Sequence, residues 1–152
     1  MGRRALIVTG AVGGLIGGAV IWLYEALVWA GIQHLMPLAA IPANAVGLSL
    51  GPAWQVLPGA AILGTAIHFA FAMAWGAAFA LAWPGLRRAG VEATLAALLL
   101  APVLWVVMHA AIVFAGYRHP DYADPAVVIG GVFSHLFYTV PMALWVRQRS
   151  VF

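Results

Sequence analysis

Four ionisable side chains lie in four separate long apolar segments of this 152-residue chain: Glu25, His68, His109 and His135. An ionisable group in hydrocarbon is costly, so it is rare unless it faces a bundle interior, a cavity or a ligand. One such residue in each segment indicates a single shared site. Three imidazoles and a carboxylate are suitable ligands for zinc, iron or copper, and helical bundles build such sites from separate helices. The pattern therefore predicts a metal site formed by all four residues.

Three other interpretations stay open for the same residues. His68 and His135 are expected at similar depth, which makes them candidates for the two axial ligands of a haem b. Histidine also exchanges protons near neutral pH, which suggests a proton-coupled transport protein. Alternatively, each histidine acts purely as an interhelical hydrogen-bond partner in an accessory or structural subunit of a larger membrane complex. None of these patterns implies a reaction, so whether the protein is an enzyme stays open.

The composition indicates a membrane protein. Hydrophobic residues make up 65% of the chain and charged residues 7%, whereas soluble domains carry about 25% charged residues. The length suits one transmembrane domain, residues 1–152, and the absence of cysteine excludes disulfide and thiol chemistry. The basic residues are all arginines at the termini and in short loops, where they report membrane topology. We therefore expect a lipid bilayer as partner and no nucleic acid.

Four membrane-spanning helices are predicted, over residues 5–29, 58–83, 91–116 and 126–146. The first is expected to be an uncleaved anchor, because no convincing signal-peptide cleavage site follows it. Segment 30–57 is rich in proline and glycine, which predicts an interfacial loop packed on the bundle. Arginines at both termini and between the second and third spans place both termini in the cytoplasm. The predicted fold class is an all-α four-helix membrane bundle, with the four ionisable residues in its outer half.

A stripe of small residues runs along the first span. Gly10, Gly14 and Gly18 recur at four-residue spacing, which places them on one helix face. Small residues at this spacing let two helix backbones approach closely inside a bilayer. The stripe predicts a contact with a second copy of the chain or with a larger membrane complex.

Three stretches around the histidines resemble one known family. Residues 67–72 (IHFAFA), 108–114 (MHAAIVF) and 131–136 (GVFSHL) are similar to sequences of the YagU-like small bacterial inner-membrane proteins. Members share a histidine in each of the last three spans and an acidic residue late in the first, the position of Glu25. The resemblance implies a multi-pass protein of the bacterial inner membrane and supports grouping the four residues. It implies no reaction, because the family is largely uncharacterised.

Overall fold

Helices make up the secondary structure of the protein over residues 1–114 and 123–150, which the computed structural model describes. Four of these helices are long and apolar enough to cross a membrane. The first is α1 (Arg3–Tyr24), which continues as the π-helix η1 (Glu25–Ile32); the others are α4 (Ala60–Arg88), α5 (Ala93–Phe114) and α6 (Pro125–Arg149). The predicted all-α fold with four helices of membrane-spanning length is confirmed for the described residues.

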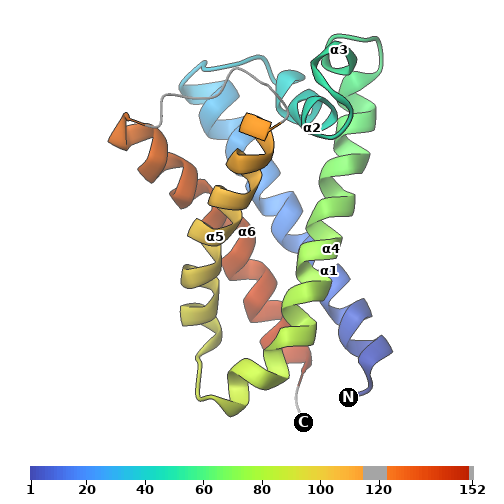
Figure 1. The fold of residues 1–152 in the computed structure, drawn as a ribbon, viewed down its shortest axis with the longest axis vertical. Helices are drawn as coiled ribbons and strands as arrows, with labels where there is room; N and C mark the ends of the chain where they lie inside the picture. Colours follow the sequence, from blue (N-terminus) through green and yellow to red (C-terminus); the bar gives the residue numbers. More distant parts are fainter. Residues whose placement is uncertain (115–122, 151–152) are drawn as a thin grey trace.

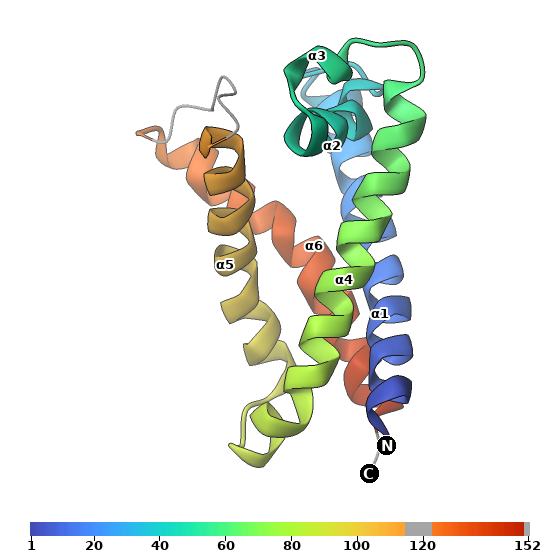
Figure 2. The ribbon, with the colours of Figure 1, turned by 45° about the vertical axis from the view of Figure 1, so that its right-hand side comes forward.

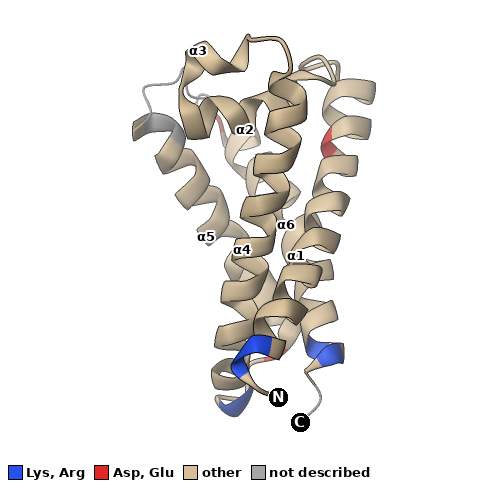
Figure 3. Cartoon of the chain, turned by 90° about the vertical axis from the view of Figure 1, so that its right-hand side faces the viewer, with Lys and Arg blue, Asp and Glu red and all other residues tan. Residues whose placement is uncertain are grey.

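Helix α1 lies at the centre of the packing. It runs along α4 on one side and α6 on the other, and α5 packs on α6 (Figure 1). Helices α4 and α5 are joined by a short turn at Gly90, whose φ of 76° a glycine adopts without strain. From that turn the two helices diverge, and the space between them widens towards the opposite end (Figure 2). Both chain termini lie at the narrow end, with the arginines that open α1 and close α4 and α6 (Figure 3).

The glycine stripe of α1 is used within the chain. A Cβ atom at Gly10 would collide with the carbonyl oxygen of Gly76, one at Gly14 with the carbonyl oxygen of Ala72, and one at Gly18 would lie 2.9 Å from the Ala72 Cβ. These collisions show that the backbones of α1 and α4 are in direct contact. The contact predicted between Gly10, Gly14 and Gly18 and a partner chain is therefore corrected, because α4 of the same chain covers all three.

Segment 30–57 also differs from the prediction. Apart from the end of η1, it folds into α2 (Ala40–Leu50) and the short α3 (Pro52–Gln55). Helix α2 packs on α4, with Val46 fully buried and the Pro42 carbonyl oxygen against Gly64. Its 11 residues are about 16 Å of helix, too short to cross a bilayer. The segment is thus packed on the bundle as expected, but as a helix. Helix α4 also runs five residues beyond the predicted end at residue 83.

Candidate functional site

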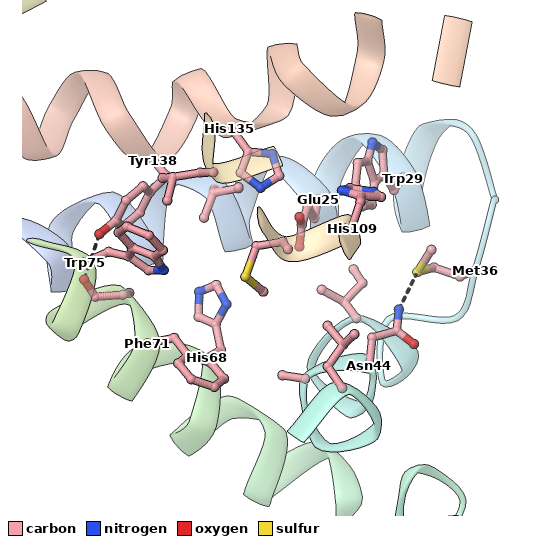
Figure 4. A pocket seen from close by; sticks show the side chains of 17 residues that line it. Glu25, Trp29, Met36, Asn44, His68, Phe71, Trp75, His109, His135 and Tyr138 are labelled. Atoms are coloured by element: carbon pink, nitrogen blue, oxygen red, sulfur yellow. Dashed lines mark hydrogen bonds between the residues drawn. The ribbon is translucent and has the colours of Figure 1, made fainter. Parts of the chain in front are cut away.

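One pocket of about 240 Å³ is lined by all four ionisable residues that the sequence singles out (Figure 4). Glu25 comes from the start of η1, His68 from α4, His109 from α5 and His135 from α6. The pocket lies where α4 and α5 have separated, on the far side of the bundle from the arginines. Each of the four long helices therefore contributes one ionisable side chain to a shared cavity.

The four residues nevertheless do not form a metal centre. Within the part of the chain that the structure describes, no group of three or more histidine, aspartate or glutamate side chains is placed to hold a metal ion. The prediction of a zinc, iron or copper site formed by Glu25, His68, His109 and His135 is therefore wrong. One physical reason is that each imidazole is hydrogen-bonded to a backbone carbonyl group. The other is that α4 and α5 diverge (Figure 2), which separates His68 on α4 from His109 on α5.

His68 is held by the neighbouring helix α1. Its Nε2 atom lies 3.0 Å from the carbonyl oxygen of Gly18. A carbonyl oxygen only accepts, so Nε2 carries the proton and donates, and Nδ1 of the neutral ring is left as an acceptor. The ring reaches the backbone because Gly18 has no side chain to cover its carbonyl group. The contact that holds the α1 and α4 backbones together therefore also orients a pocket histidine.

His109 and His135 are held by their own helices. Nδ1 of His109 lies 2.7 Å from the carbonyl oxygen of Trp105, and Nδ1 of His135 lies 2.8 Å from that of Gly131. Each acceptor lies four residues earlier in the same helix, so Nδ1 is the protonated nitrogen in both neutral rings. For His135 this leaves Nε2 as a hydrogen-bond acceptor at the pocket. The haem alternative for His68 and His135 is not tested by these contacts and stays a prediction.

Glu25 stands at the start of an unusual helical segment. The eight residues of η1 form a π-helix, a conformation that is rare and is frequently found at functional sites. The Glu25 side chain is half-buried and lines the pocket. Among the described residues it makes no ion pair and no side-chain hydrogen bond, and the ion pair found there joins Arg147 to Glu92 at the narrow end. Within residues 1–114 and 123–150, this carboxyl group in an apolar pocket thus has no side-chain partner.

The remaining walls are mainly apolar and aromatic. Trp29, Phe71, Trp75 and Tyr138 line the pocket, and α2 closes one side with Asn44 and neighbouring apolar residues. The contribution of α2 could not be seen in the sequence, because a segment rich in proline and glycine gives no helical signal. Phe71 lines the pocket and is still 44% exposed. It therefore marks a rim that faces outwards from the bundle, towards lipid in a membrane.

Tyr138 lines the pocket from α6 and is hydrogen-bonded to α4. Its hydroxyl group donates to the carbonyl oxygen of Ala72 over 2.7 Å, and the residue is buried. We expect Tyr138→Phe to lower the free energy of unfolding by about 1 kcal/mol, because this interhelical hydrogen bond is lost. Thermal unfolding in detergent measures the effect. Tyr24→Phe is the matched control, since the Tyr24 hydroxyl makes no hydrogen bond among the described residues. Equal stability of both variants would contradict the role assigned to the Tyr138 hydroxyl.

Comparison with family models, with curated proteins and with solved structures finds no match. The resemblance to YagU-like proteins therefore stays a prediction.

Proposed function

We propose that this multi-pass membrane protein binds a lipophilic amine in the pocket lined by Glu25, His68, His109 and His135. The observation that carries the proposal is the Glu25 carboxyl group, which has no partner among the described residues in a pocket of apolar and aromatic walls. A carboxylate that is partly withdrawn from water into an apolar pocket is costly unless it is paired. A cationic ligand supplies the missing partner.

The hydrogen-bonding groups of the pocket support an amine. An ammonium group has donors and no acceptor, while a carboxylate and the unprotonated nitrogen of a neutral imidazole accept. Glu25, Nδ1 of His68 and Nε2 of His135 together form an acceptor-rich surface. Trp75 and Phe71 also line the pocket, and an aromatic ring whose face lies within about 6 Å of an ammonium group attracts it through a cation–π contact. An anionic ligand would instead meet the Glu25 carboxylate, and no arginine lines the described pocket.

The arrangement of charges supports a topology with both termini in the cytoplasm. Six arginines lie at the terminal end of the bundle, from Arg3 and Arg4, the end of α4 and the end of α6. Short loops and ends rich in arginine favour the cytoplasmic side. Glu25 is 22 residues along the first helix from Arg3, about 33 Å at the rise of an α-helix. The pocket would then lie in the outer half of the membrane.

The proposal is tested by comparing benzylamine with benzyl alcohol on the purified protein in detergent. The two probes have the same ring and nearly the same size, but only the amine is cationic at neutral pH. We expect benzylamine to bind roughly tenfold or more tightly than the alcohol, because a charge-assisted hydrogen bond to a carboxylate is stronger than a neutral one. Isothermal titration calorimetry gives both dissociation constants. Equal affinities, or no binding of benzylamine, would overturn the proposal.

A further inference from the structure

We infer that the amine carries a hydrocarbon chain, which lies in a second pocket along the seam between α4 and α5. The inference rests on the proposed function and extends it from an amine to a single-chain amphiphile. It is carried by the shape and chemistry of that second pocket and by its continuity with the first.

The second pocket has a volume of about 340 Å³ and apolar walls. Ala78, Ala82 and Leu86 line it from α4, and Ala96 and Leu100 line it from α5. Among the described residues that line it, none is charged and Trp75 alone has a hydrogen-bonding side chain. The small alanine side chains on both helices leave room between them. Such a surface favours a hydrocarbon chain and is unfavourable for a second polar group of the ligand.

The two pockets follow one seam. Trp75 lines both of them. On the facing helix, Leu104 lines the first pocket and Leu100, one turn away, lines the second. A molecule held by its amine at Glu25 therefore meets the second pocket as soon as its chain passes Trp75. From Trp75 to Leu86 the seam is about 16 Å long, at a rise of 1.5 Å per residue.

The direction of the seam fits an amphiphile already in the bilayer. The acceptor-rich pocket lies away from the arginines, and the apolar pocket extends from it towards the narrow end of the bundle. In the proposed topology the amine lies in the outer half, and the chain runs past the bilayer centre towards the arginine end, because the second pocket reaches Leu86 beside the last turn of α4. Ala78 and Ala82 are exposed on the bundle surface, so the chain can reach the seam sideways from the lipid.

The test compares a short and a long amine on a variant that fills the second pocket. Benzylamine and dodecylamine are titrated into the wild type, Ala78→Trp and Ala70→Trp in the same detergent. The control position Ala70 is exposed and lines neither pocket. We expect Ala78→Trp to weaken dodecylamine binding about tenfold or more and to leave benzylamine within about twofold. Ala70→Trp should leave both affinities unchanged. Because the detergent is constant, partitioning of dodecylamine into micelles cancels in each comparison.

The other outcomes separate the inference from the proposed function. If Ala78→Trp binds dodecylamine like the wild type while benzylamine still binds, the chain lies elsewhere and only the inference falls. If the wild type binds neither amine, the proposed function itself falls. A second copy of the chain at the seam would show as a changed oligomeric state in Ala78→Trp with unchanged amine affinities, which also overturns the inference. Parallel loss of both amines in Ala78→Trp would count against the inference.

Discussion

Glu25→Gln is expected to weaken benzylamine binding by roughly thirtyfold or more, equivalent to about 2 kcal/mol, because removing one partner of a buried charge pair typically costs that much. Glutamine keeps the length and shape of the side chain and can still accept a hydrogen bond, so the change isolates the negative charge. The affinity for benzyl alcohol should stay within a few fold. Calorimetric titration of both probes against both proteins measures the difference.

The matched control for this prediction is Glu92→Gln. Glu92 lies in an exposed ion pair with Arg147 at the narrow end of the bundle. Its replacement removes the same charge without touching the pocket, so the amine affinity should not change. If Glu25→Gln and Glu92→Gln bind benzylamine as tightly as the wild type, the carboxyl group of Glu25 does not recognise the amine.

Gly14→Ala is expected to lower the free energy of unfolding by about 2 to 3 kcal/mol, although alanine favours helix more than glycine does. The added Cβ would collide with the carbonyl oxygen of Ala72 and lie 3.0 Å from the Met73 Cα. Both neighbours are backbone atoms, so no side-chain rotation relieves the clash and α1 must move away from α4. Thermal or denaturant unfolding in a mild detergent measures the loss.

Gly85→Ala is the control for this second prediction. Gly85 lies inside α4, and a Cβ there meets nothing within 4 Å. The same substitution should therefore be neutral or slightly stabilising, by up to about 1 kcal/mol. If both alanine variants are equally stable, close contact between the α1 and α4 backbones does not hold the bundle together.

The membrane spans could be predicted from the sequence because they depend on local composition alone. Long apolar runs and arginines at their ends suffice to place them within a few residues. The shared pocket also followed from placing one ionisable residue in each run, since such groups avoid lipid. Pro42 shows where local composition misleads. It lies near the start of α2, where a residue without an N–H group interrupts no helical hydrogen bond.

The chemistry of the pocket depends on the rotamer of each side chain. The spacing of residues in the sequence predicts the helix face on which a side chain lies, but not its rotamer. His135 is on the predicted face, but its bond to the Gly131 carbonyl group turns one ring nitrogen back to its own helix. His68 makes the equivalent bond across to Gly18. The glycine stripe was ambiguous for a similar reason, because close backbone approach has the same signature within a chain and between chains. Gly76 on α4 supplied the complementary surface.

The hydrogen bond between His68 and Gly18 links ligand binding in the pocket to the stability of the folded bundle. One nitrogen of the His68 ring holds the carbonyl group of Gly18 on α1, and the other is an acceptor at the pocket. A ligand that donates to the second nitrogen polarises the ring and strengthens the first bond. Whatever binds only the folded bundle also shifts its unfolding equilibrium, by an amount that grows with the logarithm of the ligand concentration. A ligand that occupies the pocket is therefore expected to stabilise the contact between α1 and α4 against unfolding.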